Sequence, residues 1–180
     1  MKTFTTQIET ERLILRPHTM DDVEPSYQMN LDKEVSRYTG DGGVQTREEI
    51  RRRIKENVLG DYAKYGFGRF AVILKSENKF IGFSGLKYLP DLDEVDLGYR
   101  LIRQYWGKGY ATESALASLD FGFNQLGMDK IIALALPENK ASIHIMDKLG
   151  FEFDKKVVED GLEAVQYVLW NEKVKTRNKK

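Results

Sequence analysis

The chain has no cysteine among its 180 residues, which excludes disulfides, thiolate metal sites and a cysteine nucleophile. Its only histidines, His18 and His144, lie far apart in the sequence, so we expect no histidine-based metal site. An excess of charge of either sign is also missing, because 28 Lys and Arg residues balance 28 Asp and Glu residues. Without a net field, neither nucleic acid nor anionic lipid is favoured as a partner.

Long apolar runs are absent as well. No stretch approaches the roughly 20 apolar residues that a membrane-spanning helix needs, and residues 1–16 lack the apolar core of a signal peptide. We therefore expect a soluble, cytoplasmic protein that binds no membrane. The length fits one domain over residues 8–172, followed by a basic tail over 173–180 that we expect to be disordered.

The most informative segment is residues 104–113, Gln-Tyr-Trp-Gly-Lys-Gly-Tyr-Ala-Thr-Glu. It follows an apolar run over 95–102 that predicts a strand, and it begins an amphipathic stretch that predicts a helix. The glycines on either side of Lys108 let backbone N–H groups crowd together in front of the positive end of the helix dipole. We expect this glycine loop, defined as residues 104–112, to bind a pyrophosphate. The alternative is an ordinary strand-to-helix turn, where Gly-x-Gly also occurs.

Apolar periodicity and turn residues predict a mixed α/β sheet, with helices between the early strands and a closing hairpin. Thr46 and Glu49 form a capping box at the start of a helix, in which Gly60 is a candidate interruption. The glycine loop then lies at the carboxyl end of the fourth strand, where open α/β sheets bind ligands. Strands are predicted over 11–16, 67–74, 80–88, 94–102, 130–136, 151–158 and 164–170, helices over 21–30, 46–65, 110–126 and 139–149, and a flexible loop over 31–45.

Four segments together resemble the GNAT acetyltransferases, and specifically the RimJ/RimL branch that acetylates protein N-termini. They are Glu11-Arg-Leu-Ile-Leu-Arg-Pro17, Asp96-Leu-Gly-Tyr99 with the following Tyr105 to Glu113, Asn139-Lys-Ala-Ser142 and Lys148-Leu-Gly-Phe151. The resemblance implies a mostly antiparallel central sheet of about seven strands with helices on both faces. It also implies acetyl-CoA as the acetyl donor, held where the fourth and fifth strands splay apart.

The resemblance assigns the cofactor contacts to three places. The glycine loop would hold the pyrophosphate, the main chain of the fourth strand would pair with the pantetheine arm and polarise the thioester carbonyl, and an asparagine would lie beside the pantetheine. Each place also has a purely structural interpretation as a turn, a strand or a helix N-cap. The residues are Gln104, Gly107, Lys108, Gly109, Tyr110, Ala111 and Thr112 in the loop, Tyr99, Arg100 and Leu101 on the strand, and Asn139.

Two residues are candidates for proton chemistry. Many GNAT enzymes protonate the departing thiolate with a tyrosine at the position that Met146 occupies here, so Ser142, or a water that it holds, is the best substitute acid. A thiolate with a pKa near 8.5 leaves with little assistance. Asp96 is the candidate base, acting through water, or the charge that binds the amine, because an α-amino group with a pKa near 8 needs only modest help. The alternative is a solvated strand residue.

The acceptor is an amine whose identity the sequence leaves open. Tyr38, Asp41 and Tyr88 are the predicted acceptor contacts, since the early loop and the third strand flank the acceptor side of related folds. An acidic cluster, which contains Asp91, Asp93, Glu94 and Asp96, suggests a cationic acceptor, although an exposed charged loop would look the same.

The predicted function is an N-acetyltransferase in which the amine attacks acetyl-CoA directly in a ternary complex, with no metal. The acceptor is a protein N-terminus or a small amine such as a polyamine, an aminoglycoside or an amino acid. A non-catalytic acyl-CoA-binding domain is the alternative from another class. The sequence does not determine the oligomeric state, and a homodimer stays open.

Overall fold

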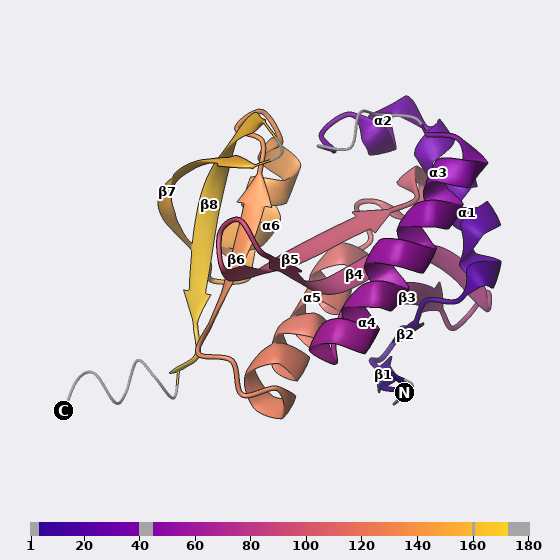
Figure 1. Cartoon of the computed structure of the whole chain (residues 1–180), viewed down its shortest axis with the longest axis horizontal. Coiled ribbons are helices and arrows are strands. Elements are labelled where there is room, and N and C mark those ends of the chain that lie inside the picture. Colours follow the sequence, from indigo (N-terminus) through magenta and orange to yellow (C-terminus); the bar gives the residue numbers. More distant parts are fainter. Residues whose placement is uncertain (1–3, 40–44, 160, 173–180) are drawn as a thin grey trace.

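The structure is a computed structural model that describes residues 4–39, 45–159 and 161–172. Its centre is one eight-stranded sheet in the order β1-β2-β3-β4-β5-β6-β8-β7 (Figure 1). The strands are β1 Ile8–Glu9, β2 Leu13–Pro17, β3 Arg69–Leu74, β4 Lys79–Leu89, β5 Glu94–Leu101, β6 Lys130–Ala135, β7 Glu152–Glu159 and β8 Leu162–Trp170. The helices are α1 Val23–Leu31, α2 Lys33–Ser36, α3 Arg47–Arg52, α4 Leu59–Tyr65, α5 Tyr110–Asp120 and α6 Lys140–Lys148.

The sheet is mixed and mostly antiparallel, as the resemblance implied. Only β5 and β6 pair in parallel among the strand pairs of the described residues. All seven predicted strands are present. The eighth is β1, which pairs antiparallel with β2 through two residues, and a strand of that length shows no alternation in the sequence.

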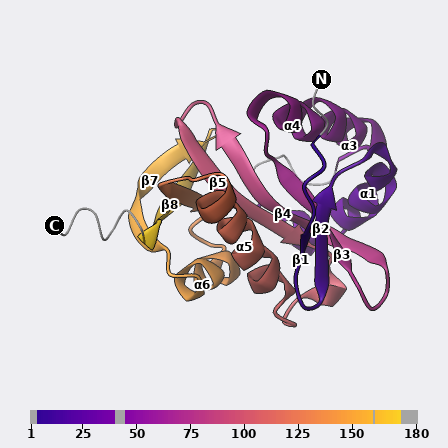
Figure 2. The ribbon, with the colours of Figure 1, turned by 90° about the horizontal axis from the view of Figure 1, so that it is seen from below.

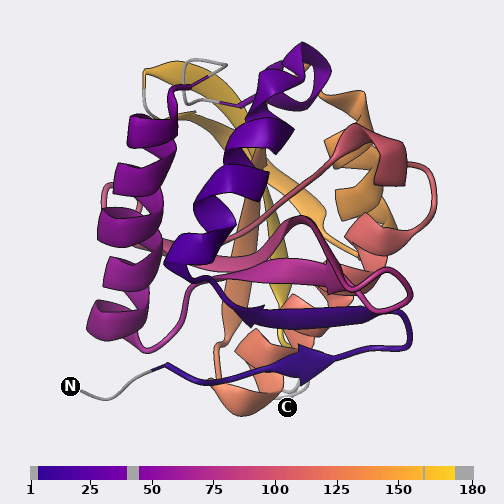
Figure 3. The ribbon, with the colours of Figure 1, turned by 90° about the vertical axis from the view of Figure 1, so that its right-hand side faces the viewer.

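Helices cover both faces of the sheet, which confirms the predicted layers. Figure 2 shows α5 and α6 on the face opposite to α1, α3 and α4, and Figure 3 shows α1 beside the helix that runs from α3 to α4. The main core lies under α5 and α6, where Ala115, Leu119 and Met146 pack with buried residues of the sheet such as Phe70 and Leu86. A smaller apolar cluster joins α1 to the α3–α4 helix through Val23, Ile50 and Ile54.

The predicted helix over 46–65 forms, and the capping box of Thr46 and Glu49 is present. The candidate interruption at Gly60 was wrong, because α3 passes through a π-helical segment, Arg53–Val58, into α4 without a break. The helix ends at Gly66, which is left-handed with a φ of 74°. Such a backbone favours glycine.

The loop predicted over 31–45 is only partly irregular. Its first residues form α2, which Asp32 caps by accepting a hydrogen bond from the Glu34 N–H. Four residues are too few to show a helical period. The predicted acceptor contact Asp41 and the predicted tail over 173–180 lie outside the described residues.

Candidate active site

A cavity of about 960 Å³ lies where β5 and β6 separate. The register joins these strands at one residue pair, Asp96 and Ile132, and beyond it the strands diverge (Figure 1). β5 stays paired with β4 along its other edge up to Leu101. Among the described strands, none therefore pairs with the β6-facing edge of β5 over residues 97–101, as a ligand that adds to a strand edge requires.

The glycine loop forms one end of this cavity. Gly107 and Gly109 are both left-handed, with φ values of 70° and 82°, and Gly109 is the residue before the first turn of α5. The first N–H groups of a helix have no acceptor inside the helix, and Gly109 has no side chain with which to cap them. These N–H groups and the dipole of the 11-residue α5 fit a pyrophosphate. Five predicted loop residues line the cavity, namely Gly107, Gly109, Tyr110, Ala111 and Thr112.

The other two predicted loop residues do not line it. Gln104 is exposed. Lys108 is exposed, its carbonyl accepts a hydrogen bond from Arg12 Nη1 at 2.9 Å, and its ammonium lies 5.6 Å from the centre of the Tyr105 ring. The predicted contact of these two residues with the cofactor stays a prediction.

A contact that the sequence did not reveal holds the glycine loop in place. The Glu113 carboxylate accepts hydrogen bonds from Arg12 N at 2.9 Å, Arg12 Nε at 2.7 Å and Thr10 Oγ1 at 2.6 Å. The Arg12 guanidinium also lies 4.5 Å from the centre of the Tyr110 ring. Partial burial raises the pKa of Glu113, but the bonds from Thr10 and Arg12 outweigh it and lower the pKa. The hydrogen bonds from Thr10 and Arg12 to Glu113 therefore hold the first turn of α5 against the turn before β2.

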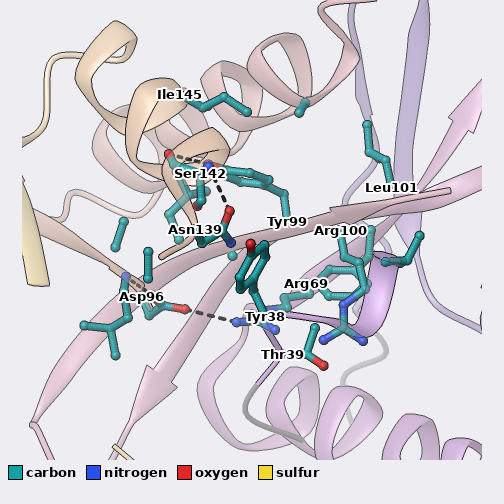
Figure 4. A pocket seen from close by; sticks show the side chains of 18 of the residues that line it. Tyr38, Thr39, Arg69, Asp96, Tyr99, Arg100, Leu101, Asn139, Ser142 and Ile145 are labelled. Atoms are coloured by element: carbon teal, nitrogen blue, oxygen red, sulfur yellow. Dashed lines mark hydrogen bonds and ion pairs between the residues drawn. The ribbon is translucent and has the colours of Figure 1, made fainter. Parts of the chain in front are cut away.

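The β6 side of the cavity carries the predicted residues of α6. Asn139 caps this helix by accepting a hydrogen bond from the Ser142 N–H at 3.2 Å. The Tyr99 hydroxyl, which comes from β5, lies 3.2 Å from Ser142 Oγ and 3.3 Å from the Ser142 carbonyl oxygen. Figure 4 shows Asn139, Ser142 and Tyr99 together in the cavity. Burial raises the pKa of Tyr99 to about 12, against the opposing effect of the Ser142 bond.

Asp96 lies at the point where the strands separate. Its Oδ2 accepts a hydrogen bond from Arg69 Nη2 at 3.0 Å, and its Oδ1 accepts one from the Leu134 N–H of β6 at 3.1 Å. The side chain is 8% exposed, and this burial raises the pKa of Asp96 despite the positive charge of Arg69. The Asp96 side chain therefore joins β5 to β6 at Leu134, two residues beyond Ile132, its partner in the strand pair. The sequence analysis did not predict this role.

Arg69 reaches Asp96 across two glycines. In the register, Arg69 of β3 lies beside Gly85 of β4, and Gly85 lies beside Gly98 of β5. A Cβ atom on Gly98 would come within 2.3 Å of Arg69 Nη2. Gly98 is thus required for the Arg69 side chain to cross the sheet, and Arg69 is a site residue that the sequence analysis missed.

The opposite wall is formed by the N-terminal helices and the face of the sheet that they cover. The predicted contact Tyr38 lines it, whereas Tyr88 is not among the lining residues. The Tyr88 hydroxyl donates to Asp93 Oδ1 at 2.7 Å, and its ring packs 5.0 Å from that of Tyr65. Two charged residues missed by the sequence analysis, Asp61 and Lys87, also line this wall. The side chain of Arg100, a residue predicted only for its main chain, lies here as well and donates to Asn30 Oδ1 at 2.6 Å.

This geometry matches an enzyme class. An uncapped helix terminus that can bind a pyrophosphate opens into a cavity with a free strand edge, and these are the features of a coenzyme A-dependent acyltransferase. The model of the acetyltransferase (GNAT) domain family matches residues 12–152. The chain belongs to this family of acyltransferases, whose fold uses acetyl-CoA.

Two relatives show how far the similarity extends. The uncharacterized N-acetyltransferase YnaD of Bacillus subtilis (strain 168) is 34% identical over 160 residues, covering 87% of this chain and 90% of that protein. The crystal structure of a GNAT family acetyltransferase from Bacillus anthracis has a TM-score of 0.79 and 29% identity, covering 93% of this chain and 99% of that one.

Two other proteins of the comparison have named acceptors. Spermidine N(1)-acetyltransferase of Escherichia coli (strain K12) is 26% identical over 157 residues, covering 85% of this chain and 80% of that protein. RimL, a ribosomal L7/L12 alpha-N-protein acetyltransferase solved with coenzyme A, has a TM-score of 0.77 over 92% of this chain and 98% of its own, at 17% identity. The latter likeness shows the fold, and membership of the RimJ/RimL branch is not shown. Among the described residues no helix is long and apolar enough to cross a membrane.

Proposed function

We propose that this protein transfers the acetyl group of acetyl-CoA to a primary amine by direct attack in a ternary complex. The observation that carries the proposal is the cavity itself, which runs from the left-handed glycines of the loop to the unpaired edge of β5. The cofactor supplies an activated acetyl thioester. The N–H groups of residues 107–112 would hold its pyrophosphate, and the main chain of Tyr99, Arg100 and Leu101 would hold its arm.

The separation of β5 and β6 supports the assignment of the oxyanion donor to β5. A main-chain N–H on the unpaired edge has no strand to pair with, so it is free to donate to the thioester carbonyl as charge develops on the oxygen. Asn139 borders the same space, although its side chain already caps α6. We keep it as a contact of the pantetheine.

Asp96 is proposed to accept the proton of the amine through a water molecule. Each carboxylate oxygen already accepts one hydrogen bond, but an oxygen has a second lone pair that a water can use. The raised pKa of Asp96, which follows from its burial, makes this carboxylate more basic than an exposed one.

We propose a protein N-terminus as the first acceptor to test and a small amine as the second. The fold likeness to RimL supports the first, and the sequence similarity to the spermidine acetyltransferase supports the second. The acidic cluster, however, no longer argues for a polycation. Asp93 accepts the Tyr88 hydroxyl, Glu94 pairs with Lys130 at 2.5 Å, and Asp96 pairs with Arg69.

The test is a thiol-release assay with acetyl-CoA and a panel of acceptors. Peptides with different N-terminal residues, spermidine, an aminoglycoside and free amino acids are compared, and mass spectrometry identifies the acetylated product. Release of CoA with acetylation of one acceptor class establishes the function. Tight binding of CoA without turnover on the whole panel would support the non-catalytic alternative.

A further inference from the structure

Two hydroxyl groups meet on the wall of the cavity between β5 and α6. The Tyr99 phenol enters from the strand and the Ser142 hydroxyl from the first turn of the helix, with 3.2 Å between their oxygens (Figure 4). Both residues line the cavity. Their neighbour one helical turn further on, Met146, is a buried thioether that cannot donate a proton.

Either hydroxyl of the pair can be the donor, and the Tyr99 phenol also reaches the Ser142 carbonyl oxygen. The Ser142 carbonyl oxygen, at 3.3 Å from the phenol, lies in the first turn of α6 and already accepts a bond inside the helix. Because the contact with Ser142 Oγ, at 3.2 Å, is the shorter of the two, we infer that the phenol donates to this hydroxyl oxygen. The Tyr99 pKa of about 12 means that the phenol keeps its proton at neutral pH and always has one to donate.

A phenol that donates to Ser142 Oγ decides where the serine proton points. Among the described residues Tyr99 is the only hydrogen-bond partner of this hydroxyl, and the usual competing bond of a helical serine to the carbonyl four residues earlier is not formed there. The serine O–H is thus turned away from Tyr99 and toward the open cavity.

We propose that Tyr99 is a positioning residue that aims the Ser142 hydroxyl at the sulfur of coenzyme A. This inference rests on the proposed function. In the reaction a carbon–nitrogen bond forms and the carbon–sulfur bond breaks, the electron pair leaves on sulfur as a thiolate, and the amine proton passes through a water molecule to Asp96. The aimed hydroxyl stabilises this thiolate by one hydrogen bond, and Tyr99 acts through Ser142 rather than on the sulfur itself.

The same contact could serve only to hold α6 against β5. A purely structural contact would change the stability of the protein but not the acidity of a bound thiol. A hydrogen-bond donor to the thiolate, by contrast, favours its charged form and lowers its pKa. The pKa of the thiol of bound coenzyme A therefore distinguishes the two roles.

The test uses the complex with coenzyme A, whose thiolate is followed by its ultraviolet absorbance as the pH is raised. The chain has no cysteine, so no thiolate of the protein contributes. We expect the bound thiol to have a pKa about one pH unit below that of free coenzyme A, as expected for one hydrogen bond to a charged group. Tyr99→Phe and Ser142→Ala should each move it back toward the free value.

The double variant decides how Tyr99 acts. If Tyr99 works through Ser142, Tyr99→Phe should change nothing further in the Ser142→Ala background, and alone it should lower kcat about threefold to tenfold with the Kd of acetyl-CoA unchanged. An unchanged thiol pKa in Tyr99→Phe, or an equal shift in the Ser142→Ala background, would overturn the proposal.

Tyr167→Phe is the matched control. Tyr167 lies on β8, packs against Phe153 and is not among the cavity residues. Removal of its hydroxyl should therefore leave the pKa of the coenzyme A thiol unchanged. The titration needs only coenzyme A binding. If no amine is acetylated, the proposed function fails while the thiol pKa values still test the Tyr99–Ser142 pair.

Discussion

Arg69 and Asp96 form an ion pair across the face of the sheet, with 3.0 Å between Nη2 and Oδ2. The pair joins the first residue of β3 to the point where β5 and β6 separate. Because Asp96 of β5 also accepts a hydrogen bond from the Leu134 N–H of β6, its carboxylate links β3, β5 and β6 at the cavity. Changes to this pair should therefore alter both stability and activity.

Gly98→Ala should destabilise the protein by about 1–3 kcal/mol, since a Cβ atom at 2.3 Å from Arg69 Nη2 forces this side chain to move. Chemical denaturation measures the loss. Gly60→Ala is the control, because a Cβ atom there meets nothing within 4 Å and alanine favours a helix. The control should keep or raise stability by up to about 1 kcal/mol. Equal effects of the two variants would contradict the crowding at Gly98.

Asp96→Asn should lower kcat/KM mainly below the pKa of the acceptor amine and much less above it, because at high pH the amine is already neutral. The pH–rate profiles of wild type and variant with one good acceptor give this comparison. A loss expressed mainly in the acceptor KM would instead assign Asp96 to amine binding. A constant loss at every pH, together with reduced stability, would leave it only the role of joining β5 to β6.

Gly107→Glu should abolish the rise in melting temperature that acetyl-CoA produces, since a carboxylate in the glycine loop repels the pyrophosphate. Gly127→Glu is a matched control. Both glycines have a φ of 70° and open space around the missing Cβ atom, so both variants carry a similar backbone strain of about 1–3 kcal/mol. Only the Gly127 variant should still respond to the cofactor. A full response of both would show that the loop does not bind it.

Acid should destabilise the protein through Asp22, which is buried and receives two hydrogen bonds of 2.8 Å from Arg16. Burial raises the pKa of Asp22, but the hydrogen bonds from Arg16 and from the Thr19 N–H, together with the nearby His18 imidazole, outweigh it and hold the pKa well below its usual range. A lowered folded-state pKa gives stability that is complete above the unfolded pKa of about 3.9 and is lost as the pH falls through the folded value.

Asp22→Asn tests this linkage. At neutral pH it should reduce the free energy of unfolding by roughly 2 kcal/mol, because Arg16 loses a charged partner. Below about pH 4 the difference between the variant and wild type should shrink, because the Asp22 carboxylate becomes protonated in the unfolded wild-type chain while it stays ionised in the folded one. A difference that stays constant down to the acid transition would show that Asp22 does not carry this pH dependence.

The sequence alone indicated the glycine loop, the caps of two helices and the seven longer strands. Each of these depends on residues close together in the chain: the two glycines around Lys108, the capping box of Thr46 and Glu49, and Asn139 before α6. Local backbone preference and local periodicity fix such features. The interruption predicted at Gly60 was wrong for the opposite reason: the packing of the surrounding helix outweighed the weak local preference of one glycine.

The tertiary structure decided the side chains that complete the site. Arg69 meets Asp96 across 27 positions, Tyr99 meets Ser142 across 43, and Arg12 meets Glu113 across 101. No local pattern encodes these pairs, because strand order and register, not spacing in the chain, bring them within hydrogen-bond distance. The sequence by itself therefore predicted a pyrophosphate site at the start of α5, whereas the fold determined which charges and hydroxyls line the cavity beside it.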